Sequence, residues 1–273
     1  MKLKLGVIIS FEHVENFDGM KELGFETCQI SCWNPEIYTE ENASVLREKA
    51  EKSGVQITAI WAGWPGPAVW NFFEGPLTLG LVPLEYRYVR AETLKKASGF
   101  AKTLNVQDVI THVGFIPENP DNFLYRSLIP VLCDIVGYLK NNNQFFNFET
   151  GQETPTTLFR TIHDIQEMGL NNVGINLDPA NLVLYGKANP VDALDLLGKY
   201  VRGVHIKDGE YPTDGVNIGR EKPVGEGRVN FSELIKKLKN FNYKGALTIE
   251  REISGPQQKT DILKAKKFLT PLL

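Results

Sequence analysis

Four side chains of metal-ligand type stand at the ends of four consecutive apolar segments in the second half of the chain. They are Glu149 in segment 144–151, Asp178 in segment 173–178, His205 in segment 201–208 and Glu250 in segment 245–252. A single acid at a strand end is most simply a helix cap or an ion-pair partner. Four such residues in succession predict one shared divalent ion, because carboxylate oxygens and an imidazole nitrogen suit Mn²⁺, Zn²⁺, Mg²⁺ or Co²⁺.

Five further residues fall near strand ends. His112 is a candidate proton carrier, partner for substrate hydroxyls or second-metal ligand, with simple packing as the alternative. Lys207 is expected near the mouth, either contacting a substrate hydroxyl, carboxylate or phosphate or as a surface lysine. Glu153 either reaches the substrate or starts the next helix. Trp33 and Trp61 follow strand ends and can stack on a sugar face.

Residues one step deeper on the same strands are the expected supports of the site. Strand alternation places Asn147 and Asn176 on the same face as the candidate ligands. They are expected to hold the carboxylates by hydrogen bonds, or to satisfy each other as polar core residues. Trp64 and Trp70 are expected to pack within a loop.

Apolar or β-branched segments alternate with helical patterns along the whole chain. The expected strands are 3–9, 27–32, 56–63, 108–114, 144–151, 173–178, 201–208 and 245–252. The expected helices are 16–24, 41–54, 83–105, 121–142, 154–169, 189–200, 230–242 and 259–269. This alternation predicts one α/β domain over residues 1–273, a single (β/α)8 TIM barrel. A doubly wound open sheet is the alternative, but no GxGxxG motif follows the first segment.

Two segments are too long to be simple connections. Residues 62–83 are rich in aromatic side chains, Gly and Pro, and residues 209–229 are rich in Gly and Pro. Each follows a strand, so both are expected on the face where barrel enzymes build their active sites. Long loops in compact domains are usually functional or disordered. We therefore expect a lid over the site.

Composition and charge narrow the class of protein. The 273 residues carry a net charge of −3, so a broad basic face for nucleic acid is not expected. No apolar stretch approaches the roughly 18 residues of a membrane-spanning helix. Three cysteines are too few for a disulfide framework, and the N-terminus shows no signal-peptide cleavage pattern. These features predict a cytoplasmic protein; barrels of this kind often pair, so a homo-oligomer stays open.

Several short motifs follow one another in the order of a known family. They are THVG (111–114), FETGQE (148–153), INLDPAN (175–181), VHIKDG (204–209), GREKPVGEG (219–227) and TIERE (248–252). Over nearly its whole length the chain resembles the xylose-isomerase-like TIM barrels, which include sugar and sugar-phosphate isomerases and epimerases, with endonuclease IV as a distant relative. The resemblance to their ketose 3-epimerases implies that Glu149, Asp178, His205 and Glu250 hold one metal ion. It also implies that Glu149 and Glu250 act as acid and base on opposite faces of the substrate.

The chain departs from the endonuclease branch of that family. Asn181 stands where those enzymes carry a metal-binding histidine three residues after the aspartate. Gly219-Arg220-Glu221 stands where they carry an Asp-Arg-His element. These differences remove two to three ligands of a trinuclear zinc site and argue against DNA repair.

The chemistry and the resemblance together predict a divalent-metal-dependent sugar or sugar-phosphate isomerase or epimerase. Its reaction moves a proton on a carbon beside a carbonyl, which needs a base, an acid and stabilisation of an ene-diolate. His112, Lys207 and Trp61 are expected to orient the sugar, and segment 62–83 to close over it. Two other classes stay open: a metal-dependent polyol or inosose dehydratase, and a sugar-binding barrel without turnover.

Overall fold

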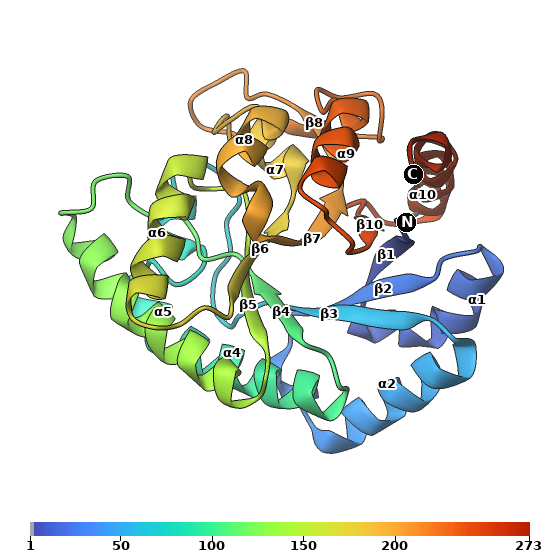
Figure 1. Ribbon diagram of the computed structural model, residues 1–273, viewed down its shortest axis with the longest axis horizontal. Coiled ribbons are helices and arrows are strands. Elements are labelled where there is room, and N and C mark those ends of the chain that lie inside the picture. The colour runs from blue at the N-terminus through green and yellow to red at the C-terminus, as the bar shows by residue number, and fades with distance from the viewer. Residues whose placement is uncertain (1–2) are drawn as a thin grey trace.

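Eight parallel strands form the centre of the molecule and close into a barrel (Figure 1). The computed structural model describes residues 3–273, so residues 1–2 of the expected domain lie outside the described part. The barrel strands are β1 (Leu5–Ser10), β2 (Thr27–Cys32), β3 (Gln56–Ala62), β4 (Asp108–Thr111), β5 (Phe145–Glu149), β6 (Val173–Leu177), β7 (Val201–Ile206) and β10 (Leu247–Ile249). They follow the order β1-β10-β7-β6-β5-β4-β3-β2, and the pairing of β1 with β10 closes the ring. The predicted TIM barrel is confirmed and the open sheet is excluded.

Helices surround the barrel (Figure 1). The α-helices are α1 (Phe17–Glu22), α2 (Glu40–Ser53), α3 (Gly75–Thr78), α4 (Leu84–Thr103), α5 (Phe123–Asn141), α6 (Pro155–Glu167), α7 (Pro179–Leu184), α8 (Pro190–Leu197), α9 (Phe231–Asn240) and α10 (Pro256–Leu269). Short 3-10 helices are η1 (Phe11–Asn16), η2 (Pro35–Ile37), η3 (Gly198–Tyr200) and η4 (Thr270–Leu272). The side chains of Thr39, Thr154 and Asn189 cap α2, α6 and α8 by accepting first-turn N–H groups, which fixes where these helices begin.

Polar side chains occupy much of the barrel interior beside a small apolar cluster of Ala59, Trp61, Ile110 and Ile8, while the main apolar core is a separate cluster. Gln29 on β2 donates to Asn176 on β6 at 3.2 Å and also contacts His205 on β7. Because β2 neighbours neither strand in the barrel, these contacts cross its interior. TIM barrels usually fill this space with bulky branched side chains. Here the interior instead supports polar groups at the carboxyl ends of the strands.

The two long loops carry secondary structure and are joined to each other. Helix α3 lies in segment 62–83, and segment 209–229 folds partly into an antiparallel hairpin of β8 (Asp208–Glu210) and β9 (Arg220–Lys222). The hairpin was not expected, because three-residue strands carry too little apolar alternation to be recognised. An antiparallel bridge between Asn71 and Asn217 connects the loops.

Asp208 organises the second loop from the end of the barrel. Its Oδ1 accepts hydrogen bonds from the backbone N–H groups of Gly209 at 2.8 Å and Val229 at 3.1 Å. Its Oδ2 accepts from Gly225 and Gly227, both at 2.9 Å. Charged acceptors make the stronger hydrogen bonds, so this buried carboxylate holds residues 225–229 against the hairpin.

Asp208→Asn is expected to lower the free energy of unfolding by about 2–4 kcal/mol, because the amide would present N–H groups to two of the four backbone donors. Urea unfolding followed by circular dichroism measures the change. Asp214→Asn is the matched control, since this exposed carboxylate only caps its own turn. If Asp208→Asn unfolds at the same urea concentration as wild type, the organising role is wrong.

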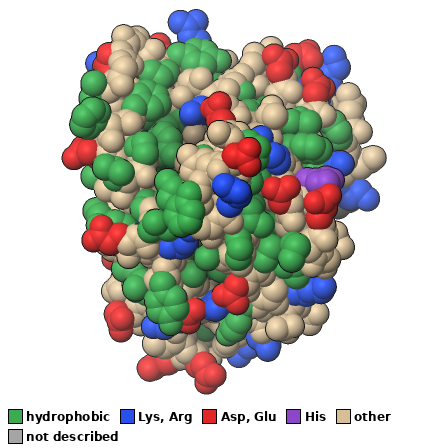
Figure 2. Space-filling view, turned by 90° about the vertical axis from the view of Figure 1, so that its left-hand side faces the viewer, with side chains coloured by type: hydrophobic (Ala, Val, Ile, Leu, Met, Phe, Trp, Pro, Cys, Tyr) green, Lys and Arg blue, Asp and Glu red, His purple; other side chains and the backbone are tan. Residues whose placement is uncertain are grey.

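The distribution of charged side chains on the surface agrees with the small net charge of the chain, −3. On the face seen in Figure 2, Lys and Arg side chains are interspersed with Asp and Glu and form no broad basic area. Within residues 3–273, no helix has the length and apolarity needed to cross a membrane. The three cysteines are free thiols.

Candidate active site

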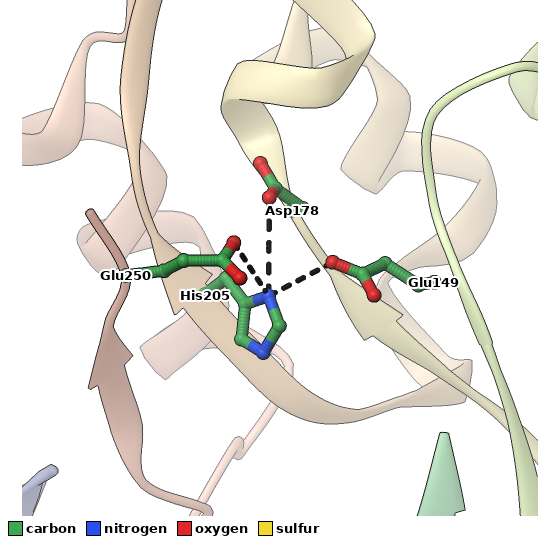
Figure 3. A group of neighbouring side chains, drawn as sticks. All are labelled: Glu149, Asp178, His205 and Glu250. Atoms are coloured by element: carbon green, nitrogen blue, oxygen red, sulfur yellow. Dashed lines mark ion pairs between the residues drawn. The ribbon is translucent and has the colours of Figure 1, made fainter. Parts of the chain in front are cut away.

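Four buried side chains meet at the carboxyl ends of the last four barrel strands (Figure 3). Glu149 is the final residue of β5, Asp178 follows β6, His205 lies on β7 and Glu250 follows β10. One ligand atom from each lies within 4.8 Å of all the others. In a parallel barrel these strand ends share one face, which explains how residues spread over a hundred positions come together.

The three carboxylates surround a single imidazole nitrogen. His205 Nδ1 lies 2.9 Å from Glu149 Oε1, 3.2 Å from Glu250 Oε2 and 3.8 Å from Asp178 Oδ2. The other oxygen of Asp178 accepts the backbone N–H of Asn181 at 2.9 Å and caps α7. That cap turns the free oxygen of Asp178 toward the imidazole.

Gln29 sets the orientation of the imidazole from the opposite side. Its amide nitrogen donates to Asn176 Oδ1 at 3.2 Å, so its carbonyl oxygen faces His205 Nε2 at 2.7 Å. A carbonyl oxygen can only accept, and therefore Nε2 carries a proton. In the neutral ring Nδ1 then presents its lone pair to the three carboxylates. Metal-binding histidines are commonly held in this way through their second nitrogen.

The donor set fits one divalent cation. Asp178 Oδ2, His205 Nδ1 and Glu250 Oε2 are buried and make no hydrogen bonds. A lone pair facing three carboxylate oxygens is unfavourable unless a cation lies between them. Two ligands about 2.1 Å from one ion, at right angles to each other, lie about 3 Å apart. The separations around Nδ1 are of this size.

The charges of the four residues depend on one another. Burial raises the pKa of Glu149, but His112 and His205 outweigh this effect and the pKa lies below its ordinary value. Burial also raises the pKa of Glu250, but Lys207 and His205 lower it below its ordinary value. Burial lowers the pKa of His205, yet Glu250 and Glu149 raise it well above its usual value. A cation at Nδ1 is therefore strongly favoured, and a proton and a metal ion compete for the same place.

Lys207 is a buried residue of the site and not a surface lysine. Its Nζ lies 2.7 Å from Glu252, 3.4 Å from Glu250 and 3.7 Å from Asp178. Burial lowers the pKa of Lys207, but these carboxylates raise it above its ordinary value, so the ammonium is retained. Its burial excludes the surface-lysine alternative and places Lys207 beside two candidate ligands.

The second oxygen of Glu149 faces an aromatic wall. Trp61 Nε1 donates a hydrogen bond to Glu149 Oε2, and His112 Nε2 lies 3.7 Å from the same oxygen. Trp61 and His112 are both buried, with ring centroids 5.9 Å apart. These contacts hold the carboxylate of Glu149 in one orientation at the edge of the pocket.

A cavity of about 420 Å³ opens directly above Glu149 and Glu250. Trp33, Trp61 and Trp70 line one side, with the Trp33 and Trp61 ring centroids 5.0 Å apart. Trp70 was expected only to pack within its loop, but it reaches the cavity and lies 5.4 Å from His112 between ring centroids. Aromatic faces beside polar groups are well suited to a sugar ring.

Two other candidates from the sequence do not line the cavity. Glu153 is buried, does not line the cavity and leaves one oxygen without a hydrogen bond; burial raises its pKa to about 8. The helix after it is capped by Thr154. Asn147 does not support Glu149, because its amide donates to Asp108 at 2.7 Å.

Sequence patterns did not assign Gln29 or Trp70 to the site. The available signal for Gln29 was a glutamine in the middle of the strand TCQISC, where an apolar residue is usual. Its partners lie 147 and 176 positions away, so only the closed barrel shows what it holds. Trp70 lies in a long loop whose path carries no periodic signal.

Gln29→Leu is expected to weaken the binding of Mn²⁺ by about 10–100-fold, because the imidazole loses the partner that fixes its proton on Nε2. Isothermal titration calorimetry of metal-free protein measures this change. Gln56→Leu is the control, since this exposed strand residue has no contact with the site. An unchanged Mn²⁺ affinity in Gln29→Leu would contradict the assigned role.

The fold and the site define a class of TIM-barrel protein in which three carboxylates and one imidazole meet at the carboxyl ends of consecutive strands. The family model of the xylose isomerase-like TIM barrels matches residues 17–272, and the chain belongs to this family. The family resemblance seen in the sequence motifs is thereby confirmed.

The chain is also similar to individual proteins. The chain is similar to a xylose isomerase domain protein from Planctomyces limnophilus, with 35% identity, a TM-score of 0.93 and coverage of 100% of this chain and 98% of the other. An uncharacterized protein from Methanocaldococcus jannaschii is 25% identical over 263 residues, covering 91% of this chain and 83% of that protein. The structure of a D-tagatose 3-epimerase-like protein shares the fold, with 23% identity, a TM-score of 0.75 and coverage of 99% and 97%.

Proposed function

We propose that the protein is a divalent-metal-dependent isomerase or epimerase of sugars, working by proton transfer through an ene-diolate. The observation that carries this proposal is the placement of Glu149 and Glu250 on either side of the His205 imidazole (Figure 3). Strands β6 and β7 separate their strands in the barrel, so the two carboxylates approach the pocket from different directions. The family and the epimerase-like neighbour support the same reaction class.

Glu149 and Glu250 are the proposed base and acid. The pKa of each is held below its ordinary value, at Glu149 by His112 and His205 and at Glu250 by Lys207 and His205, so both are ionised in the free protein and either can accept a proton from a carbon. Trp61 and His112 fix the Glu149 carboxylate, and Lys207 fixes that of Glu250. Two oriented carboxylates on different sides of a substrate can remove a proton from one face and return it to the other.

Asp178 and His205 would complete the ligand set around the ion. A bound divalent ion supplies polarisation of neighbouring carbonyl and hydroxyl oxygens, which makes the adjacent C–H more acidic. The residues of this chain provide the remainder: Gln29 orients the imidazole, and the α7 cap orients Asp178. The donor set does not choose among Mn²⁺, Zn²⁺, Mg²⁺ and Co²⁺.

The pocket favours a neutral sugar ring next to the ligands. The three tryptophans offer stacking faces, and His112, with a buried Nδ1 that makes no hydrogen bond, is a candidate partner for a hydroxyl. The cations beside the pocket are already paired, since Lys207 lies between carboxylates and Arg251 pairs with Glu221 and Asp261. Trp33 and Trp61 are therefore assigned to ring stacking. Lys207 does not line the cavity and is assigned to holding the Glu250 carboxylate. Glu153 has no direct route to the ring and is assigned to the buried wall behind it.

The test is exchange of solvent deuterium into a sugar C–H. The metal-loaded protein would be incubated in D₂O with a panel of ketoses, aldoses and inosose-type polyols, and the products followed by NMR. Deuterium incorporation with formation of an isomer or epimer supports the proposal. Loss of water from a polyol would indicate a dehydratase, and binding without exchange would indicate a sugar-binding barrel. If the protein takes up no divalent metal under any loading condition, the proposal fails.

A further inference from the structure

A second, larger cavity adjoins the pocket above the candidate ligands. It has a volume of about 830 Å³ and is lined by residues of segment 209–229 together with Trp70 of segment 62–83. We call it the outer pocket; its lining includes Trp70, Glu210, Tyr211, Asp214, Arg220 and Arg228. None of the candidate metal ligands lines it, and the proposed proton transfer does not use it.

Trp70 belongs to the lining of both pockets. Its side chain lines both cavities, and its ring centroid lies 5.4 Å from that of His112 in the inner pocket. The loop carrying Trp70 is attached to the hairpin loop by the Asn71–Asn217 bridge and by the hydrogen bond from Phe72 N to Val216 O at 2.9 Å. The two loops are thus joined next to Trp70, the residue that the linings of the two cavities share.

The outer pocket differs from the inner pocket in how its charged side chains are paired. Glu210 pairs with Lys222 at 3.3 Å, and the Asp214 carboxylate accepts the backbone N–H groups of its own turn. Within the described part of the chain, no ion pair engages Arg220 or Arg228, and both are exposed. Guanidinium groups in this state are suited to bind phosphate or carboxylate through paired N–H donors.

We propose that the outer pocket is a second subsite, which binds the part of the sugar substrate remote from the reacting carbons, and that this part carries an oxyanion. This inference rests on the proposed function, because it assumes that a sugar occupies the inner pocket. The inner pocket takes the neutral ring between the tryptophans and the carboxylates. Arg220 and Arg228 take a phosphate or a carboxylate group beyond Trp70. The substrate is then an acidic sugar derivative and not a simple ketose.

Binding measurements test the subsite without relying on turnover. Calorimetric titrations would compare D-fructose, D-fructose 6-phosphate and D-fructuronate, which differ in the group remote from the ketone. We expect at least one anionic sugar to bind ten-fold or more tightly than D-fructose, and the better of the two identifies the oxyanion. In Arg220→Gln/Arg228→Gln this advantage should fall by about 10-fold or more, as expected for loss of hydrogen bonds to a charged group. D-fructose binding should stay unchanged.

The control is Lys236→Gln, which removes an exposed positive charge on α9, away from the outer pocket. It should keep the full preference for the anionic sugar, and all variants should unfold at the wild-type temperature. The subsite is overturned if neither anionic sugar binds better than D-fructose, or if the preference survives in the double arginine variant. Failure of deuterium exchange with all sugars would instead count against the proposed function. The binding comparison could still be interpreted, because it does not depend on turnover.

Discussion

Glu149→Gln and Glu250→Gln are each expected to lower the rate of sugar isomerisation or epimerisation by about 10³-fold or more. Each change is isosteric and removes a group that accepts or returns the proton, and general acid–base groups contribute about 10²–10⁴-fold. The surroundings of each residue favour the ionised form, so the wild-type protein has both bases available. The rate would be measured with the most active sugar of the deuterium-exchange panel.

If the protein is an epimerase, the two variants are expected to differ in which epimer still exchanges its proton. In the proposed mechanism each glutamate acts on one face of the substrate, so the one that remains can still remove a proton from the epimer whose C–H points toward it. In Glu149→Gln, solvent deuterium should exchange into one epimer, and in Glu250→Gln it should exchange into the other. Neither variant should interconvert the two epimers. Exchange of both epimers by a single variant would contradict the assignment of one base to each face.

Because Glu149 and Glu250 are also candidate metal ligands, the experiment must distinguish loss of the bound metal from loss of the catalytic base. Asp178→Asn removes a candidate ligand with no proposed role in proton transfer, and the asparagine oxygen can still cap α7. Excess metal should restore most of the activity of Asp178→Asn but not that of the two glutamate variants. Glu41→Gln, an exposed change on α2, should behave as wild type. A glutamate variant that binds metal and keeps its rate within ten-fold of wild type would remove that residue from the mechanism.

Chelation of divalent ions is expected to abolish exchange and to lower the midpoint of thermal unfolding by about 5 °C or more. Without a metal ion, three buried carboxylates and one imidazole lose their shared partner. A ligand present at 100 times its Kd stabilises a protein by about 2.7 kcal/mol, and each kcal/mol shifts the midpoint of a domain of this size by roughly 2–4 °C. Readdition of Mn²⁺, Zn²⁺, Mg²⁺ or Co²⁺ should restore both properties and rank the metals.

The effect of chelation should grow as the pH rises. In the metal-free protein a proton on His205 takes the place of the ion, and Glu250 and Glu149 raise the pKa of His205 well above its usual value, despite its burial. A group with a raised folded-state pKa contributes stability that is lost as pH rises above its ordinary value of about 6.5. Differential scanning fluorimetry at pH 6 and pH 9 measures this. Equal midpoints with and without metal at pH 9 would argue against a bound ion in the site.

The barrel and the four candidate ligands could be predicted from the sequence, because both depend on local patterns. Strand and helix periodicity recurs eight times, and a parallel barrel places every strand end on one face. A residue type at the end of a strand therefore has a predictable location. This is why Glu149, Asp178, His205 and Glu250 could be grouped before any distance between them was known.

The residues that orient and enclose the site depend on distances that no local pattern contains. Gln29 reaches His205 only because β2 lies across the closed barrel from β7, and Lys207 is buried only because Glu252 and Glu250 follow the end of β10. The outer pocket exists because two loops without periodic signal meet at Trp70 and the Asn71–Asn217 bridge. Repeated patterns thus encode the scaffold and its strand ends, whereas packing across the barrel and between its loops determines the hydrogen bonds and cavities of the candidate site.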